Sequence, residues 1–426
     1  MITKEYWIEL IKNWNKREFP KIIEREVKIP FELEINRVFS IVGPRRAGKT
    51  YEMLLIAKKI AEKEGKDKTF YINFERADLG PLKYSNLVIM LRAYYELFPD
   101  NHKKKIWLFL DEIQNVDEWE KFVRTCLDDG IKVFISGSSS KLLSKEVATS
   151  MRGRNLSYNI FPLSFREFLE FRDFKIPKTY SSDEKSNLIN NLSKYLSLGG
   201  YPEAVLFPDE KETILRDIFE TAIVKDIIER HKIRNSFLLK TLIKALIGAK
   251  EFSVNKFYNY LRSQQIKSSK DSLYKYLSYL EDAFFIFSLN KFSLSYKKAE
   301  QSLPKIYFID NGLLTINGID DKGRLMENLV FIELLRRKKD ISYFQTASGE
   351  EVDFIIKEGK KVKQLIQVCY DLSNFMTLER EVKPLIKASE EFGCNELLIL
   401  NLDVEKEEKI QGKKIKFIPL WKWLLE

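Results

Sequence analysis

The feature that most constrains this chain is the octapeptide GPRRAGKT at residues 43–50, directly after the apolar run VFSIV at residues 38–42. It fits the pattern G-x-x-x-x-G-K-[ST] at every fixed position, and a helical pattern follows it to about residue 63. A phosphate-binding loop of this kind lies between a strand and a helix, because loop amides and the helix N-terminus hold the phosphates together. The sequence therefore predicts an α/β domain that binds a nucleotide.

The positions of this loop have separate predicted roles. The two fixed glycines let the backbone curl so that its N–H groups point inward, Lys49 reaches the β- and γ-phosphates of ATP, and the Thr50 hydroxyl ligates Mg²⁺. The loop residues expected to bind the nucleotide are Gly43, Pro44, Arg45, Arg46, Ala47, Gly48, Lys49 and Thr50.

The partner of the loop is the run IWLFLDEIQ at residues 106–114, in which five apolar residues end in two acids. A buried strand that delivers a carboxylate beside Mg²⁺ is what a phosphate-binding loop requires. Asp111 is expected to hold the metal with Thr50, and Glu112 to orient or deprotonate the attacking water. The second acid predicts hydrolysis, because a domain that only holds a nucleotide does not need it.

Three further residues are candidates for catalysis. The run KVFISGS at residues 132–138 predicts the next strand, and Ser136 near its end is placed to contact the γ-phosphate or the water. Arg152 and Arg154 follow in MRGR, and an arginine that reaches a neighbouring γ-phosphate accelerates hydrolysis strongly. The alternative is that both arginines form internal ion pairs.

Composition limits the other kinds of chemistry. The chain contains three cysteines and two histidines and no C-x-x-C, which indicates a reducing, cytoplasmic setting without a zinc site. The N-terminus is charged throughout and does not resemble a secretory signal, and no apolar run approaches the ~18–20 residues that cross a bilayer, so we expect no membrane partner. The net charge of +10 favours nucleic acid as a partner; a solvated surface rich in Lys and Glu is the alternative.

The order of elements along the chain predicts several domains. Apolar runs that alternate with helical sequence predict a parallel α/β sheet in the first 140 residues, and residues 163–248 are almost wholly helical. Two amphipathic segments, 252–262 and 269–283, have the spacing of a helix-turn-helix, with Ser253 and Ser269 as N-caps and a strand-like wing after them. From about residue 303 the α/β alternation returns.

The C-terminal region contains part of a second metal site. Restriction-endonuclease-like folds place an acid on a helix, an Asp on one strand and E-x-K on the next, and this chain offers Glu327, Asp353 and Gln367-Val-Cys369. Residues 367 and 369 share one face of a strand, so Glu327, Asp353 and Gln367 are expected to converge on one ion. The neutral Gln367 weakens attraction for Mg²⁺, and Cys369 stands where a lysine is needed. The pattern therefore predicts a degenerate nuclease site that binds without cutting, with a structural network of acids and arginines as the alternative.

The motifs together resemble a known family. GPRRAGKT, LDEIQ, ISGSSSKLLSKEVATSMRGR, FPLSFREF and GGYPEAVL are similar to motifs of archaeal and bacterial AAA+-like ATPases, over roughly residues 20–420. The resemblance implies an AAA+-like P-loop ATPase core with a helical lid, a winged helix and a PD-(D/E)xK nuclease-like α/β domain. The expected boundaries are 1–165 for the ATPase core, 166–235 for the lid, 236–300 for the winged helix and 301–426 for the nuclease-like domain. The related STAND ATPases contact the nucleotide with a G-x-P motif, which implies that Pro202 in Gly-Tyr-Pro binds it here.

Three functions follow as hypotheses. The first is an ATPase, with ATP and Mg²⁺, that binds nucleic acid by structure rather than sequence, acts on branched or forked DNA, and assembles into a homo-oligomer or ring. The second is a STAND-like switch in which ATP controls docking of a protein partner. The third is an ATP-gated, Mg²⁺-dependent DNA nuclease.

Overall fold

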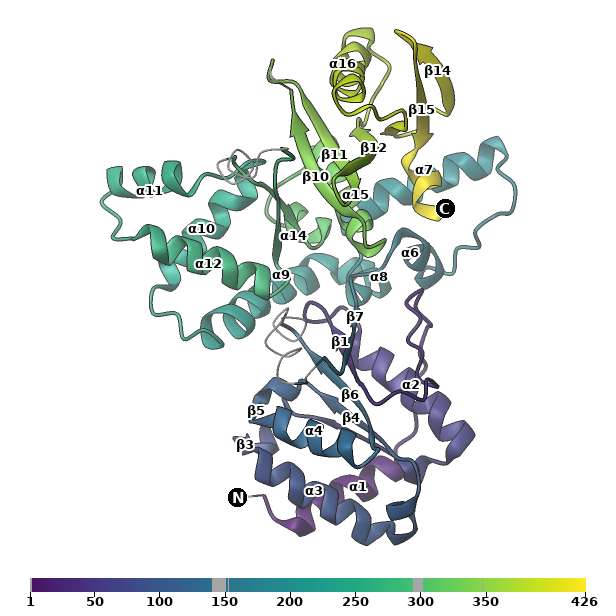
Figure 1. Ribbon diagram of the computed structural model, residues 1–426, viewed down its shortest axis with the longest axis vertical. Helices are drawn as coiled ribbons and strands as arrows, with labels where there is room; N and C mark the ends of the chain where they lie inside the picture. The colour runs from purple at the N-terminus through teal and green to yellow at the C-terminus, as the bar shows by residue number, and fades with distance from the viewer. Residues whose placement is uncertain (1, 140–150, 152, 294–301, 347) are drawn as a thin grey trace. The chain divides into compact units, whose positions relative to one another are not determined.

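The computed structural model describes residues 2–139, 151, 153–293, 302–346 and 348–426 (Figure 1). The chain forms two compact units, Met1–Ile160 and Phe161–Glu426. Within the described residues, no helix is long and apolar enough to cross a membrane.

The N-terminal unit is built on a five-stranded sheet in which every paired strand is parallel, in the order β2-β4-β6-β1-β7. Its strands are β1 (Val38–Val42), β2 (Thr69–Asn73), β4 (Trp107–Asp111), β6 (Lys132–Gly137) and β7 (Asn155–Asn159). The first four lie where the apolar runs predict strands. Because parallel strands present their carboxyl ends at one edge, the ends of β1, β4 and β6 meet there.

Helices and short elements complete this unit. The helices are α1 (Lys4–Lys16), α2 (Lys49–Glu64), α3 (Tyr84–Leu97) and α4 (Trp119–Asp128), and a small parallel pair joins β3 (Leu82–Lys83) to β5 (Val116–Asp117). The first helix is attached to the edge strand β2 through Trp14, whose Nε1 donates to the Thr69 carbonyl oxygen at 2.9 Å. The Trp14 ring also lies against Tyr71, with the ring centroids 5.5 Å apart.

The second unit begins with helices. These are α6 (Phe165–Phe171), α7 (Ser182–Leu198), α8 (Pro202–Leu206), α9 (Lys211–Thr221), the π-helix η7 (Ala222–Glu229), α10 (Ser236–Gly248), α11 (Val254–Ser263) and α12 (Lys270–Asp282). Ser253 and Ser269 cap α11 and α12 by accepting backbone N–H groups, as predicted. An antiparallel pair follows, β8 (Ile286–Leu289) with β9 (Lys305–Phe308).

The chain ends in a six-stranded mixed sheet in the order β10-β11-β12-β13-β15-β14. The strands are β10 (Asp340–Gln345), β11 (Glu351–Glu358), β12 (Lys361–Val368), β13 (Leu397–Asn401), β14 (Lys406–Ile410) and β15 (Lys413–Pro419). The accompanying helices are α14 (Asn311–Thr315), α15 (Lys322–Arg336), α16 (Phe375–Phe392) and α17 (Leu420–Leu425), drawn in green to yellow in Figure 1.

Beside a smaller core between α16 and the C-terminal sheet, a large apolar core extends through the second unit. The same cluster of buried side chains contains Phe165 of α6, Leu242 of α10, Leu280 of α12, Phe331 of α15 and Trp421 of α17. The predicted lid, winged helix and nuclease-like domain therefore share a core, and the boundaries between them remain predictions.

A buried carboxylate joins two distant parts of that core. Asp310 accepts from the Gly200 N–H at 2.7 Å and from the Gly312 N–H at 2.8 Å. A Cβ on Gly199 would lie 1.8 Å from Asp310 Oδ1, so the position requires glycine. The Gly-Gly pair therefore has a packing role within this unit.

Candidate functional site

The loop after β1 has the geometry of a phosphate-binding loop. Gly43 has φ of 156°, and a Cβ there would lie 2.1 Å from the Ile160 carbonyl oxygen, so no side chain fits. Gly48 has φ of 105° and forms the N-cap of α2, whose first residue is Lys49. The N-terminus of α2 thus opens directly from the loop, which is the arrangement that binds phosphate.

Side chains of the loop are fixed by their neighbours. Lys49 is 5 % exposed, and its Nζ donates to the Pro44 carbonyl oxygen at 3.0 Å. Arg45 makes a bidentate ion pair with Glu75, with N–O distances of 2.7 and 3.0 Å. Two loop residues differ in exposure: Arg46 is exposed and Ala47 is buried.

The carboxylate at the end of β4 is held by donors from neighbouring elements. Asp111 Oδ2 accepts from Thr50 Oγ1 and from the Tyr71 hydroxyl, each at 2.7 Å, and Asp111 Oδ1 accepts from Ser136 Oγ. Burial, reinforced by the charge of Glu112, raises the pKa of Asp111 above its usual value, while these hydrogen bonds act in the opposite direction. The structure thus brings three predicted residues together and adds Tyr71.

The second acid faces the lysine of the loop. Glu112 has φ of 52°, in the left-handed region, and its N–H donates to Ser136 Oγ at 3.0 Å. Its Oε1 lies 3.4 Å from Lys49 Nζ, and its Oε2 accepts from Gln114 Nε2 at 2.5 Å. Glu112 and Lys49 are therefore close enough to act at the same phosphate, as their predicted roles at the γ-phosphate and the attacking water require.

The site fits a Mg²⁺ ion and a nucleotide. A hydroxyl oxygen and a carboxylate oxygen, from Thr50 and Asp111, lie 2.7 Å apart, and hard oxygen ligands are what Mg²⁺ prefers. These two residues would hold the ion with the phosphates of the nucleotide.

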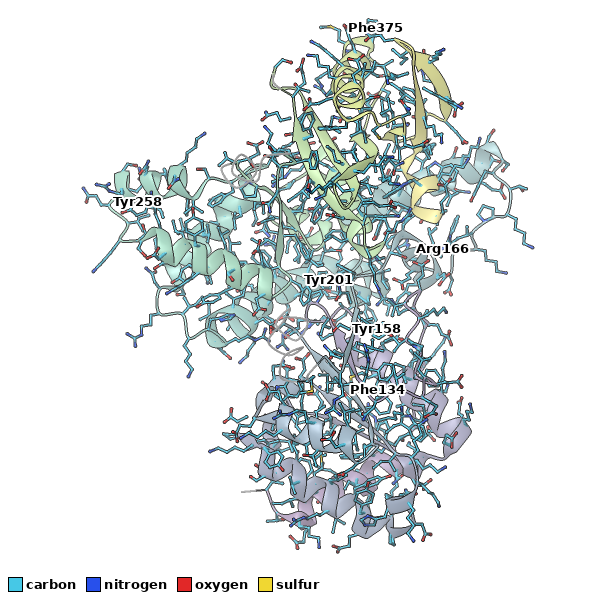
Figure 2. All side chains as sticks on the ribbon, in the orientation of Figure 1. Phe134, Tyr158, Arg166, Tyr201, Tyr258 and Phe375 are labelled. Atoms are coloured by element: carbon cyan, nitrogen blue, oxygen red, sulfur yellow. The ribbon has the colours of Figure 1, made fainter. Side chains whose placement is uncertain are left out.

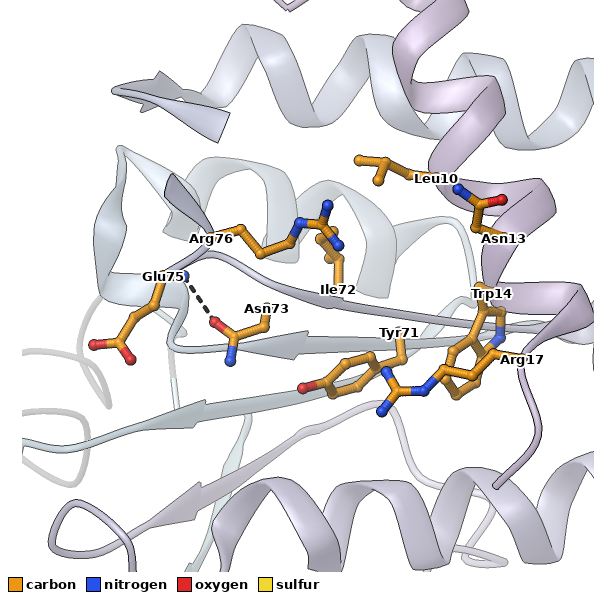
Figure 3. Close-up of a pocket in the computed structure, with 9 residues that line it drawn as sticks. All are labelled: Leu10, Asn13, Trp14, Arg17, Tyr71, Ile72, Asn73, Glu75 and Arg76. Atoms are coloured by element: carbon orange, nitrogen blue, oxygen red, sulfur yellow. Dashed lines mark hydrogen bonds between the residues drawn. The ribbon is translucent and has the colours of Figure 1, made fainter. Parts of the chain in front are cut away.

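A pocket of about 450 Å³ adjoins this site, between the end of α1 and the end of β2 (Figure 3). It is lined by Leu10, Asn13, Trp14, Arg17, Tyr71, Ile72, Asn73, Glu75 and Arg76. Tyr71 bonds Asp111 and Glu75 pairs with Arg45, so two lining residues are also attached to the nucleotide site. Neither contact could be read from local sequence.

Of the two arginines expected to act on a neighbouring nucleotide site, the structure describes one. Arg152 lies outside the described residues. Arg154 makes an ion pair with Asp128, with Nη1 and Oδ1 2.8 Å apart, as the alternative of an internal pair predicts. A role for Arg154 in hydrolysis stays a prediction.

Pro202, expected to contact the nucleotide, is the first residue of α8 in the second unit. The preceding residue, Tyr201, is buried, and the Gly200 carbonyl oxygen accepts from the Leu163 N–H at 2.7 Å. These contacts give the Gly-Tyr-Pro turn a role in packing, and its contact with a nucleotide stays a prediction.

In the C-terminal region, Glu327 and Asp353 are brought together by a lysine. Lys305 Nζ lies 2.8 Å from Glu327 Oε1 and 3.2 Å from Asp353 Oδ1. Lys305 was missed by sequence reasoning; it is the first residue of β9 and shares a face of that strand with Tyr307. The arginines of the alternative network bond other groups: Arg336 and Arg337 pair with Glu333, and Arg324 donates to the Ala249 carbonyl oxygen at 3.1 Å.

Gln367 and Cys369 do not complete a metal site. Gln367 Oε1 accepts from the Asp353 N–H at 3.3 Å, and Gln367 Nε2 donates to Glu381 Oε2 at 2.6 Å. Cys369 is buried, and burial raises its pKa to about 11. Lys357, four residues along β11 from Asp353, is too far along the strand to replace the missing lysine, and its Nζ pairs with Asp340 Oδ1 at 3.1 Å.

These residues do not fit a divalent ion. Lys305 already bonds the carboxylate oxygens that would face it, and the Gln367 amide is bonded on both sides. No group of three or more His, Cys, Asp or Glu side chains in the described part of the chain is arranged to hold a metal.

The strand order, the loop and the carboxylate pair define the N-terminal unit as a P-loop domain of the AAA type, and a family described as "AAA domain" matches residues 35–169. Two families described as domains of unknown function match residues 189–322 and 322–423.

The chain belongs to the protein family of "Uncharacterized protein MJ1544" of Methanocaldococcus jannaschii, to which it is 40 % identical over 100 % of this chain and 96 % of that protein. An "Uncharacterized protein" of Haemophilus influenzae is 30 % identical over 87 % of this chain and 88 % of its own length.

Solved structures with a similar arrangement include two proteins of Aeropyrum pernix. The ORC2 protein in its ADP form has 12 % identity, covers 75 % of this chain and 98 % of its own, and has a TM-score of 0.36. The ORC1 protein in complex with DNA has 12 % identity, covers 79 % and 93 %, and has a TM-score of 0.31. Scores of this size carry no argument about function.

Proposed function

We propose that the N-terminal unit hydrolyses ATP. The observation that carries this proposal is the arrangement around Asp111, which accepts from Thr50, Ser136 and Tyr71 while Glu112 lies 3.4 Å from Lys49. A site that only holds a nucleotide does not need the second acid at this point.

Each residue has a distinct part in this proposal. Lys49 binds the β- and γ-phosphates, and Glu112 orients the attacking water and takes its proton. Ser136, which donates to Asp111 and accepts from the Glu112 N–H, positions both acids. Thr50 and Asp111 would hold Mg²⁺, and the ion would supply positive charge to the phosphate oxygens.

We further propose that hydrolysis is coupled to nucleic acid through helices α11 and α12. The two helices and the turn between them carry exposed cations and tyrosines that are exposed or half-buried, which together we term the α11–α12 face; its residues are Lys256, Tyr258, Tyr260, Arg262, Lys267, Lys270, Tyr274 and Lys275. The ring centroid of Tyr258, a residue labelled in Figure 2, lies 5.7 Å from Lys270 Nζ and 6.0 Å from Arg262 Cζ. Cations interleaved with aromatic rings suit a phosphate backbone and unpaired bases.

The helix pair and the following hairpin also support the winged-helix interpretation. The N–H of Ile306 in β9 donates to the Lys250 carbonyl oxygen at 3.0 Å, so β9 pairs on both sides. Since no set of side chains for reading base edges stands out on α12, we propose recognition of DNA structure, such as a branch or fork, rather than sequence. We also propose that the chain assembles into a homo-oligomer in which Arg154 reaches the nucleotide site of a neighbouring copy.

A second candidate function is a nucleotide-operated switch that docks a protein. Phe375 and Met376, at the start of α16, are 75 and 76 % exposed, and Phe375 is labelled in Figure 2. Two adjacent apolar side chains in water are typical of a protein contact.

The test is the steady-state ATP hydrolysis rate without DNA and then with single-stranded, duplex and four-way-junction DNA. We expect one DNA structure to raise the rate several-fold and Lys49→Ala to abolish turnover. The double variant Lys270→Glu/Lys275→Glu should keep the basal rate and lose the stimulation. Lys409→Glu/Lys414→Glu makes the same charge change on the paired strands β14 and β15 and should remain stimulated.

The outcomes separate the candidates. A low rate that stays flat across all DNA structures would favour the switch and direct the search to protein partners. Equal stimulation of both double variants would remove the α11–α12 face from the proposal while leaving the ATPase intact. Turnover retained by Lys49→Ala would overturn the site itself.

A further inference from the structure

A buried charge cluster lies where β9, α15 and β11 meet. Lys305 of β9 is 3 % exposed, and its Nζ contacts carboxylate oxygens of Glu327, Glu351 and Asp353 at 2.8, 2.5 and 3.2 Å. The Tyr307 hydroxyl donates to the same Glu327 oxygen at 2.7 Å. Three carboxylates thus surround one ammonium, and a fixed hydroxyl supports one of them.

The charge states of this cluster are strongly displaced. Burial opposes the charged lysine, but Tyr307, Glu327 and Asp353 raise the pKa of Lys305 well above its usual value. Burial opposes the ionised form of Glu327 as well, and the Lys305 ammonium lowers the pKa of Glu327 below its usual value. Burial, with the charge of Glu327, raises the pKa of Asp353 to about 7. The charged form of Lys305 is therefore favoured, and its nearest buried partner is Glu327, whose oxygen also accepts from the Tyr307 hydroxyl.

A divalent ion would have to displace this ammonium. Mg²⁺ requires near-octahedral oxygen ligands at about 2.0–2.1 Å, and Lys305 Nζ already contacts one oxygen of each of Glu327, Glu351 and Asp353, while Asp353 Oδ2 accepts from the Val368 N–H at 2.9 Å. An ion bound to them would lie against a positive charge with no water between. The neutral Gln367, bonded to Glu381, adds no charge to offset this repulsion.

We infer that Lys305 is the resident cation of this site and takes the place of a divalent metal, so that the C-terminal unit holds its carboxylates together without metal-dependent cleavage of nucleic acid. The lysine also joins the hairpin that follows α12 to the helix and sheet of the nuclease-like region. This inference goes beyond the proposed ATPase and does not depend on it, since no residue of the N-terminal unit takes part.

The test is binding of Mn²⁺ to the full-length, nucleotide-free protein, followed by electron paramagnetic resonance of free and bound ion. Asp353→Asn removes a carboxylate of this cluster only, so an Mn²⁺ ion lost in this variant was bound here and not at the nucleotide site of the N-terminal unit. We expect wild type and Asp353→Asn to bind Mn²⁺ alike. Lys305→Met keeps the buried aliphatic stem but removes the charge. It should gain one Mn²⁺ site that binds at least tenfold more tightly than any Mn²⁺ site it shares with wild type. The double variant Lys305→Met/Asp353→Asn should lose this additional site.

Two further variants complete the design. Lys357→Met removes an ammonium from β11 outside the cluster and should leave Mn²⁺ binding unchanged. Lys305→Arg keeps the positive charge and should bind no additional Mn²⁺. If Lys305→Met does not fold, the comparison of wild type with Asp353→Asn still decides: equal binding supports the inference, and an Mn²⁺ site lost on Asp353→Asn overturns it. A folded Lys305→Met that gains no site also overturns it, as does Mg²⁺- or Mn²⁺-dependent nicking by wild type that Asp353→Asn abolishes.

Discussion

The hydroxyl of Tyr71 is expected to support Asp111, the carboxylate proposed to bind Mg²⁺, and Tyr71→Phe tests this. The variant removes the bond to Asp111 Oδ2 while keeping the ring against Trp14. A hydrogen bond to a charged group contributes about 1.5–3 kcal/mol. Because Asp111 keeps its bonds from Thr50 and Ser136, we expect the lower part of this range, roughly 1.5–2 kcal/mol, which corresponds to a half-saturating Mg²⁺ concentration about 12- to 30-fold higher.

The variant should also change the pH dependence of hydrolysis. Asp111 must be ionised to hold the metal, and its hydrogen bonds lower a pKa that burial has raised. Loss of one donor raises the pKa of Asp111 further, so the acidic limb of the rate profile should move to higher pH.

The assay is the ATP hydrolysis rate as a function of Mg²⁺ concentration and of pH, with thermal unfolding of the same samples. Tyr94→Phe is the matched control, since that buried hydroxyl donates at 2.6 Å to the Asp67 carbonyl oxygen away from the site. It should lower stability without changing the Mg²⁺ dependence. If Tyr71→Phe has the Mg²⁺ dependence and acidic limb of wild type, the reasoning is refuted.

Three further predictions concern other positions. Gly43→Ala should destabilise the protein on the order of 3 kcal/mol in denaturant unfolding, because its Cβ would lie 2.1 Å from the Ile160 carbonyl oxygen; near-wild-type stability would contradict this. Asp310 has a pKa raised by burial to about 7, so between about pH 4 and 7 the unfolded chain loses a proton that the folded chain keeps, and folding stability falls as pH rises. Asp310→Asn should remove about 3 kcal/mol of the difference in unfolding free energy between urea unfolding at pH 4.5 and at pH 7.5, and an unchanged difference would disprove the shift. Arg154→Ala should reduce hydrolysis more than tenfold if the arginine acts on a neighbouring site, whereas Asp128→Ala, which breaks the same exposed ion pair, should not; equal rates in both variants would limit Arg154 to that pair.

Local patterns predicted most of the fold. The four apolar strands and the phosphate-binding loop were identified because a buried parallel strand reads as a continuous apolar run. Two of the strands that were missed, β7 (NLSYN) and β14 (KEEKI), are polar and lie at the edges of their sheets, where only part of a strand is buried.

The residues of the candidate sites were likewise predicted where a motif fixes their position and missed elsewhere. Thr50, Asp111 and Ser136 were predicted together because strand ends fix their positions, and the structure places them in contact. Lys305 and Tyr71 were missed because neither belongs to a motif, and not because their contacts are distant: these span 22 to 48 residues, against 61 for Thr50 and Asp111. Such contacts depend on packing of whole elements, which no local pattern encodes.

The continuous core of the second unit limits how this chain can be divided. A cut between α10 and the C-terminal sheet would expose apolar surfaces on both fragments, since Leu242, Leu280 and Phe331 belong to one cluster. The described chain therefore offers one modular boundary, between Ile160 and Phe161. Recombination during evolution, and chimeras made in the laboratory, should succeed by exchanging the whole N-terminal unit there, while transplants of the helix-turn-helix or the terminal sheet alone should yield insoluble protein.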